Sequence, residues 1–155
     1  MNLLVSLLHQ RNIDNIDALY RLHSSDEIYC MSIGIMLVTH PGVGRAILQT
    51  ARDIIGHTQL TIRCVEVPID SISETIQQQL DTCITQFSAC TGVLILTDLY
   101  AATPHNMASH RVTDNTLVLA GLNLPMLLRV LNYADETSLS VLYEKAKLGG
   151  IRGIY

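Results

Sequence analysis

The side chains with the clearest chemical potential are a histidine and an aspartate that each follow an apolar run. His40 comes directly after Ile33–Thr39 (IGIMLVT), and Asp98 comes directly after Gly92–Thr97 (GVLILT). A carboxylate beside an imidazole accepts one ring N–H and fixes the tautomer, which leaves the lone pair of the other nitrogen free as a nucleophile or base. If the fold brings these two residues together, they form a reactive pair.

The hydrophobic pattern indicates which strands and helices carry this pair, because strand-like and helix-like segments alternate from Met31 onward. This alternation predicts an α/β fold, with an open, mainly parallel sheet flanked by helices on both faces. Asn123 and Pro125 are typical of a helix cap and a first helical turn. The predicted strands are 33–39, 60–67, 92–97 and 116–122, and the predicted helical segments are 45–55, 72–87, 103–112, 125–131 and 138–148.

Sites in open α/β sheets lie beyond the carboxyl ends of the strands, where the strand order reverses. In the common order 2-1-3-4, the first and third strands are neighbours, so His40 and Asp98 are expected to face each other across one crevice. Gly42 and Gly44 allow backbone amides to approach an anion closely. The helix that begins near Thr103 offers N–H groups, a hydroxyl and a positive dipole end. Together these residues predict an imidazole that accepts a phosphoryl group and a phosphate site of Gly42, Gly44 and Thr103.

Structural interpretations of the same residues stay open at this point. A lone histidine after a strand is often an ordinary turn residue, and an aspartate such as Asp98 is often a turn or helix cap. Arg45 could hold a phosphate, or it could be a solvated residue of the first helical turn. His105 and His110 lie five residues apart, which does not suit a pair of metal ligands on one helix face. We expect neither a metal nor a cofactor.

Composition narrows the classes of partner. The chain has 155 residues, a net charge of −4 and 48% hydrophobic residues, and it contains no basic cluster. The missing basic patch argues against binding of nucleic acid, and no run reaches the ~18 apolar residues of a membrane span. The four cysteines form no C-x-x-C pair, which favours reduced thiols and a cytoplasmic location.

Residues 1–30 differ from the rest of the chain. Their helical spacing of leucines ends before Met31, where the regular alternation begins. We therefore expect an N-terminal extension over residues 1–30 and one domain over residues 31–155.

Three stretches together resemble the EIIA domain of the mannose-family bacterial phosphotransferase system. They are IGIMLVTHPGVGRAILQTARDIIG, GVLILTDLYAATPHNMAS and VLAGLNLPMLLRVLNY. The resemblance runs from about Ile33 to the C-terminus, and the order and spacing of the three motifs agree with the family.

This resemblance implies a phosphotransferase component of a sugar transport system. His40 matches the histidine that takes a phosphoryl group from the phosphocarrier HPr and passes it to an EIIB domain. Asp98 matches the aspartate that hydrogen-bonds this histidine, and Thr103 takes the place of a serine near the phosphorylation site. The family also implies a homodimer with an exchanged C-terminal antiparallel edge strand, for which Ile151–Tyr155 is the candidate. Contact with a membrane would be indirect, through a transport complex.

The chain departs from the family pattern after the aspartate. The family commonly has an aromatic residue, two glycines, serine and proline, whereas this chain has Tyr100, Ala101, Ala102, Thr103 and Pro104. Alanines restrict backbone conformation more than glycines do, so the phosphate site is expected to differ.

The sequence leaves two further functions open. One is a regulatory EIIA-like protein, in which the phosphorylation state of His40 controls a partner without sugar transport. The other is a hydrolase that uses His40 and Asp98 as a base, although no serine or cysteine nucleophile motif accompanies them.

Overall fold

The described part of the chain alternates strands and helices as the hydrophobic pattern predicts. The computed structural model describes residues 32–155 except residues 57 and 136, so the expected extension over residues 1–30 lies outside the described residues. The strands are β1 (Ile33–Thr39), β2 (Ile62–Glu66), β3 (Gly92–Thr97) and β4 (Thr116–Ala120). The helices are α3 (Val43–Ile55), α4 (Ser73–Thr85), α5 (Thr103–Ser109), α6 (Leu124–Tyr133) and α7 (Leu139–Arg152).

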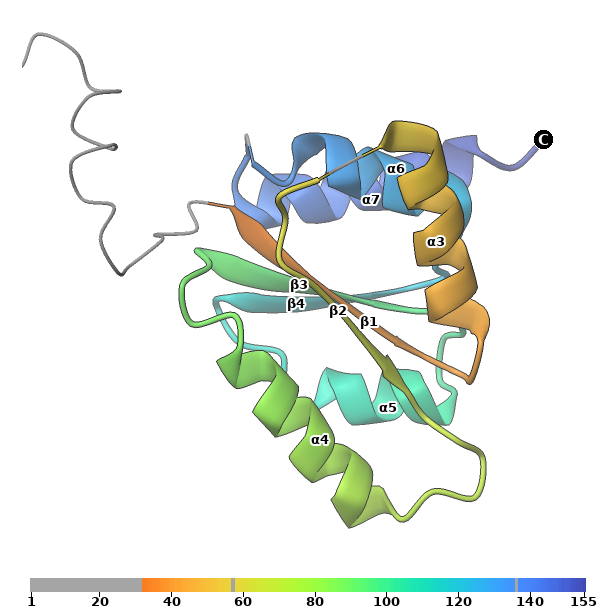
Figure 1. Ribbon diagram of the computed structural model, residues 1–155, viewed down its shortest axis with the longest axis vertical. Helices are drawn as coiled ribbons and strands as arrows, with labels where there is room; N and C mark the ends of the chain where they lie inside the picture. The colour runs from red at the N-terminus through yellow and green to blue at the C-terminus, as the bar shows by residue number, and fades with distance from the viewer. Residues whose placement is uncertain (1–31, 57, 136) are drawn as a thin grey trace, which may run out of the picture.

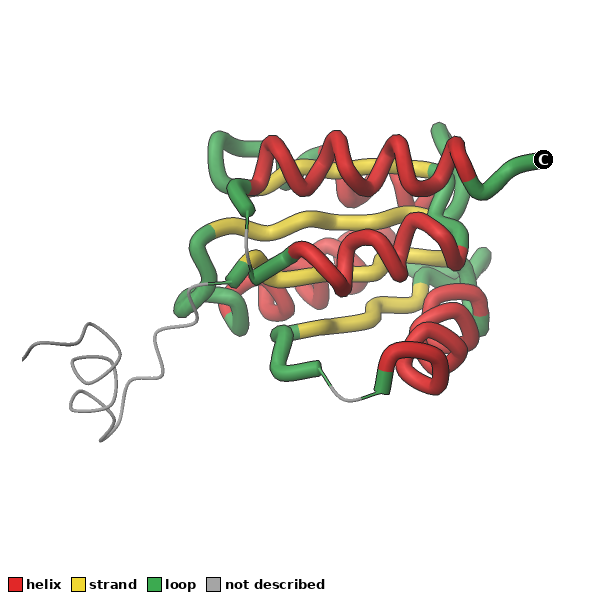
Figure 2. Tube along the Cα trace, turned by 90° about the horizontal axis from the view of Figure 1, so that it is seen from above, coloured by secondary structure: helices red, strands yellow, loops and turns green. Residues whose placement is uncertain are grey.

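The four strands form one parallel sheet in the order β2-β1-β3-β4, as the sequence predicted. Figure 2 shows the strands lying side by side between two layers of helices. β1 pairs with both β2 and β3, and the registers place Thr39 beside Glu66 and Val38 beside Thr97. The carboxyl ends of β1, β2 and β3 therefore meet at the edge of the sheet where the strand order reverses.

Helices cover both faces of the sheet, and each face has its own core. Helices α3, α6 and α7 lie on one face, and α4 and α5 lie on the other (Figure 1). All seven residues of β1 are buried, and successive side chains enter opposite cores, with Ile35 and Leu37 in one and Met36 and Val38 in the other. This two-sided burial explains the continuous apolar runs of the central strands. None of the described helices is long and apolar enough to cross a membrane.

The C-terminal segment differs from the expectation. Helix α7 continues through Ile151 and Arg152, and residues 153–155 are not in a strand, so the expected antiparallel edge strand over 151–155 is absent from the described sheet. The helix continues because Gly149 and Gly150 are buried against α6. A Cβ atom at Gly149 would lie 2.8 Å from the Cβ of Arg129, so glycine permits close packing of the two helices here.

Candidate active site

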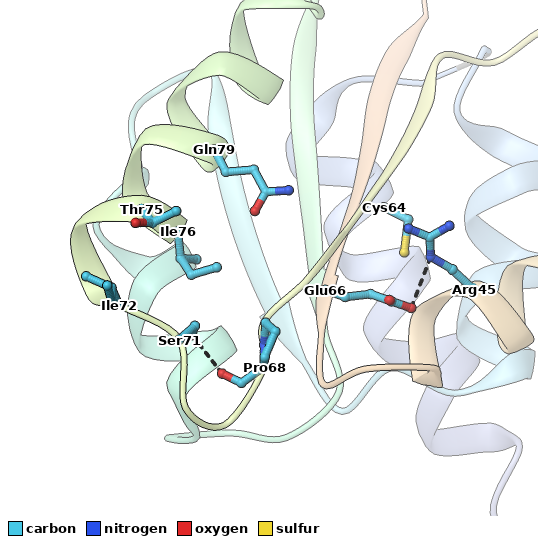
Figure 3. Close-up of a pocket in the computed structure, with 9 residues that line it drawn as sticks. All are labelled: Arg45, Cys64, Glu66, Pro68, Ser71, Ile72, Thr75, Ile76 and Gln79. Atoms are coloured by element: carbon cyan, nitrogen blue, oxygen red, sulfur yellow. Dashed lines mark hydrogen bonds and ion pairs between the residues drawn. The ribbon is translucent and has the colours of Figure 1, made fainter.

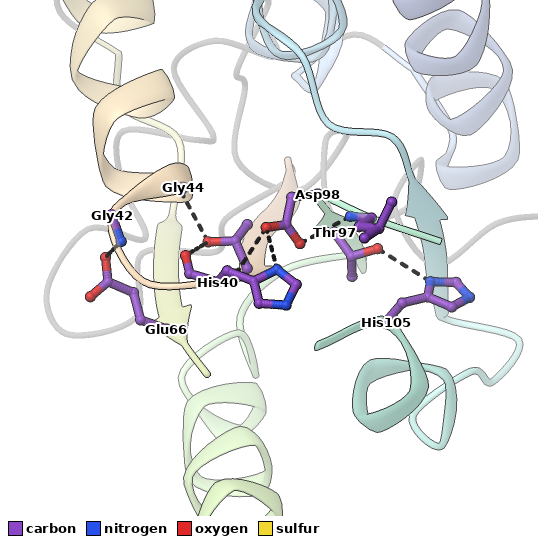
Figure 4. A network of polar contacts seen from close by, with 9 residues as sticks. His40, Gly42, Gly44, Glu66, Thr97, Asp98 and His105 are labelled. Carbon is purple, nitrogen blue, oxygen red and sulfur yellow. Dashed lines mark hydrogen bonds and ion pairs between the residues drawn. The ribbon is translucent and has the colours of Figure 1, made fainter. Parts of the chain in front are cut away.

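His40 and Asp98 come together at the carboxyl edge of the sheet, as the sequence predicted (Figure 4). The Nδ1 atom of His40 lies 2.8 Å from Oδ2 of Asp98, and the backbone N–H of His40 donates to the same oxygen at 2.9 Å. The side chain of His40 is 33% exposed and that of Asp98 is 11% exposed. The carboxylate is thus largely shielded, while the imidazole stays accessible.

Asp98 is held in its ionised form by its contacts. Partial burial alone would raise its pKa, but hydrogen bonds from the backbone and ring of His40, together with the charge of that ring and the backbone N–H of Leu99, outweigh burial. The pKa of Asp98 is therefore lower than the ordinary value for an aspartate. A carboxylate in this position accepts from Nδ1–H, so that in a neutral imidazole the lone pair is on the other ring nitrogen, Nε2. Among the described residues, none forms a hydrogen bond with Nε2 of His40.

The turn after His40 begins helix α3, and its backbone amides already have partners inside the protein. The N–H of Gly42 donates to Oε1 of Glu66 at 3.0 Å, and that of Gly44 donates to Oγ1 of Thr39 at 3.0 Å. Gly42 has a φ of 83°, in the left-handed region that glycine tolerates best. A Cβ atom on Gly44 would lie 2.8 Å from Oγ1 of Thr39. Both glycines are thus required by the shape of the turn, whether or not they contact a phosphate.

Glu66 is a site residue that the sequence did not single out. It is the last residue of β2, and its Oε1 accepts from Gly42 and also lies 3.1 Å from Nε of Arg45. The rule that predicted His40 and Asp98, a polar residue at the carboxyl end of a strand beside the switch in strand order, also applies to Glu66. Arg45 is 71% exposed and forms this ion pair at the rim.

The loop between β3 and α5 contains Thr103 and the two alanines that depart from the family pattern. Thr103 is the first residue of α5 and is exposed. Ala101 has a φ of 60°, the only positive φ of a non-glycine residue among those described. Alanine adopts this conformation at a cost of about 1 kcal/mol. At Ala101 the loop therefore has the left-handed backbone conformation that glycine adopts most easily, although the residue is alanine.

His105 lies at the same edge of the sheet and has its own contacts. Its Nδ1 lies 3.2 Å from Oγ1 of Thr97, and its ring packs against Tyr100 with centroids 4.9 Å apart. Neither contact followed from the spacing of His105 and His110. In the described ranges, no group of three or more histidine, cysteine or acidic residues could hold a metal ion.

A surface hollow of about 500 Å³ lies beside the carboxyl-terminal half of β2, between the start of α3 and the first turns of α4 (Figure 3). Its polar lining includes the ion pair of Arg45 and Glu66, whereas His40 and Asp98 are not among its lining residues. The imidazole of His40, whose side chain is 33% exposed, therefore lies outside this hollow. The lining residues are Arg45, Cys64, Glu66, Pro68, Ser71, Ile72, Thr75, Ile76 and Gln79.

The family model EIIA-man, described as "PTS system fructose IIA component", matches residues 34–147. The match contains His40, Asp98 and Thr103. The mannose-specific EIIAB component of the phosphotransferase system (PTS) of Escherichia coli K12 is 30% identical over 108 residues, which are 68% of this chain and 33% of that protein. This chain thus spans about a third of the length of the curated relatives it matches.

Solved structures agree with this fold. A PTS component EIIA from Streptococcus agalactiae has a TM-score of 0.70 at 27% identity, covering 79% of this chain and 95% of that one. A PTS IIA protein associated with the fucose utilization operon of Streptococcus pneumoniae has a TM-score of 0.72 at 19% identity, covering 81% of this chain and 93% of that one. With the match over residues 34–147, these comparisons show that the chain belongs to the EIIA-man family of PTS components.

Proposed function

We propose that this protein is a histidine phosphocarrier of a phosphotransferase system, which accepts a phosphoryl group from HPr on His40 and passes it to an EIIB domain for sugar uptake. The observation that carries the proposal is the contact of Nδ1 with Asp98 at 2.8 Å on a ring that is 33% exposed. This contact directs the lone pair of Nε2 outward. Family membership supports the same role.

The transfer needs only two imidazoles. The lone pair of Nε2 of His40 attacks the phosphorus of the donor phosphohistidine, and the P–N bond of the donor breaks, returning its electron pair to the donor ring. His40 keeps its proton on Nδ1 and becomes a phosphorylated imidazolium, whose charge the Asp98 carboxylate stabilises. Transfer to EIIB reverses these roles, and neither step requires a metal or cofactor.

Thr103 and the turn glycines are the proposed phosphate ligands. The hydroxyl of Thr103 lies on an exposed residue at the start of α5, where it can donate to a phosphate oxygen. The amides of Gly42 and Gly44 donate to Glu66 and Thr39 in the unphosphorylated protein. They would contact a phosphoryl group only by exchanging these acceptors for it.

The open rim suits a protein donor better than a small molecule. Exposed apolar side chains flank the reactive pair, including Leu99 and Tyr100 directly after Asp98. HPr and an EIIB domain are the proposed partners, in the cytoplasm, with the membrane reached only through the transport complex.

We extend the proposal to a homodimer. The end of α7 and the residues after it expose Ile151, Ile154 and Tyr155, apolar side chains that a second copy could cover. An exchanged strand formed by residues 151–155 would require the last residues of α7 to unwind. Light scattering of the purified protein tests the dimer.

Incubation with phosphoenolpyruvate, enzyme I and HPr tests the phosphocarrier function. We expect a mass increase of one phosphate that is labile in acid and absent from His40→Ala. A wild-type protein that gains no phosphate would overturn the proposal. A phosphoprotein that transfers to no EIIB domain, but binds another partner only in one phosphorylation state, would favour the regulatory role.

A further inference from the structure

Two carboxylates from neighbouring strands hold the turn that carries His40. Asp98, directly after β3, accepts from the backbone and ring of His40, and Glu66, at the end of β2, accepts from the backbone of Gly42. Figure 4 shows the turn between these two side chains. The turn therefore has one acidic anchor on each side of β1.

The Glu66 anchor acts on a residue of the turn that has no side chain to pack against its neighbours. Gly42 is the N-cap of α3, with a φ of 83°, and as a glycine it has no side chain that could cap the helix. A Cβ at this position would meet no atom within 4 Å, so packing does not fix this residue. The carboxylate of Glu66, 24% exposed, also lies near the positive end of the α3 dipole.

We propose that Glu66 is a positioning residue for His40. By fixing the amide of Gly42 at 3.0 Å, it holds the turn in the shape that keeps the imidazole on Asp98 and Nε2 directed outward. This inference rests on the proposed phosphocarrier function and adds a residue on which the transfer rate depends. For this positioning, Glu66 must offer an oxygen that accepts the hydrogen bond from Gly42; its charge is not required.

The ion pair with Arg45 has a secondary role. Nε of Arg45 lies 3.1 Å from the same Oε1, but the arginine side chain is 71% exposed, and exposed ion pairs contribute little. Arg45 orients the carboxylate of Glu66, whereas the hydrogen bond from Gly42 couples that carboxylate to the position of His40.

Single-turnover phosphorylation by phospho-HPr at increasing donor concentration tests this proposal. Glu66→Met keeps a similar side-chain length without an acceptor. We expect its maximal rate to fall about tenfold, the factor of one lost charge-assisted hydrogen bond, with the half-saturating donor concentration unchanged. Glu66→Gln keeps an acceptor oxygen and is expected to stay within about threefold of wild type. Glu74→Ala, which removes an exposed acidic residue in the first turn of α4, is the matched control and should leave the rate unchanged.

Two results would overturn the proposal. One is a maximal rate for Glu66→Met within twofold of wild type. The other is a fall in the maximal rate of Glu66→Gln or Arg45→Ala as large as that of Glu66→Met. Such a result would assign the effect to the charge of Glu66 or to its ion pair with Arg45.

Nitrogen-15 NMR of the imidazole in the unphosphorylated protein provides a readout that does not depend on transfer. We expect the Nδ1–H signal of His40 to be retained in Glu66→Gln and to broaden by faster exchange in Glu66→Met. An unchanged signal in Glu66→Met would contradict the positioning role. If the wild-type protein accepts no phosphate, the phosphocarrier function fails, and this spectrum still decides whether Glu66 positions the ring.

Discussion

One carboxylate oxygen, Oδ2 of Asp98, accepts both from the backbone N–H of His40 at 2.9 Å and from its ring at Nδ1 at 2.8 Å. The backbone contact fixes the position of the His40 main chain, and the ring contact fixes the orientation of the imidazole. Because β1 and β3 are adjacent parallel strands, the sheet itself sets this distance. The strand order therefore determines that Nδ1 contacts Asp98, which leaves Nε2 as the reactive nitrogen of the proposed phosphocarrier.

Replacing Asp98 by asparagine should slow phosphorylation of His40. Asparagine has nearly the same shape but loses the charge that stabilises the imidazolium, and a hydrogen bond to a charged group contributes about 1.5–3 kcal/mol, or roughly 10- to 100-fold in rate. Single-turnover phosphorylation followed by intact mass measures the change. Asp114→Asn, which alters an exposed aspartate in the loop before β4, is the control. A rate for Asp98→Asn within twofold of wild type would rule out the electrostatic role.

The stability of the protein should depend on acid pH through Asp98. The pKa of Asp98 in the folded protein lies below the ordinary value of 3.8. At a pH between the folded and unfolded pKa values, the unfolded state therefore binds more protons than the folded state. The contribution of Asp98 is present above the unfolded pKa and is lost as the pH falls through the folded pKa. Urea unfolding at about pH 5 and about pH 3 should show a smaller loss of stability in Asp98→Asn than in wild type. Equal losses would show that other carboxyl groups carry the pH dependence.

Glycine at position 101 should stabilise the fold. Ala101 has a φ of 60°, and relief of this conformation by glycine is expected to raise the free energy of unfolding by about 0.5–1 kcal/mol. Ala102→Gly is the control. Ala102 has a φ of −77°, so glycine relieves no strain there and lowers the stability by raising the entropy of the unfolded chain. Urea unfolding of both variants checks this prediction, and a destabilised Ala101→Gly variant would contradict it.

Asn123 should contribute through its cap of α6. Its Oδ1 accepts from the backbone N–H of Met126 at 2.9 Å, and its Nδ2 donates to the carbonyl of Gly150 at 3.3 Å. Asn123→Ala removes both contacts and should cost about 1–2 kcal/mol. Asn123→Asp keeps the cap and should cost less, as measured by thermal or urea unfolding. An alanine variant as stable as the aspartate variant would show that the cap contributes nothing.

Much of this architecture follows from the sequence because the two central strands are buried on both faces. Strands β1 and β3 have the predicted limits, since a continuous apolar run ends sharply where the chain reaches solvent. The pair His40 and Asp98 follows from those two ends and the strand order. The cap at Asn123 follows from residue type.

The features that the sequence did not reveal depend on contacts between distant elements. Glu66 acts on a backbone amide, and residue type does not show which amide a side chain reaches. Gly149 and Gly150 are residue types that disfavour a helix interior, but they lie in α7, where their small size lets α6 approach closely. The left-handed backbone of Ala101 runs against the preference of its residue type, so only the structure reveals it.

The ring nitrogen of His40 that carries the phosphoryl group shows whether Asp98 orients the imidazole for transfer. Phosphorus-31 and nitrogen-15 NMR of the protein phosphorylated by phospho-HPr can distinguish the two ring nitrogens of His40. Because Asp98 accepts from Nδ1, we expect a phosphoryl group on Nε2 with a proton retained on Nδ1. Phosphate on Nδ1, or on a residue other than His40, would contradict it.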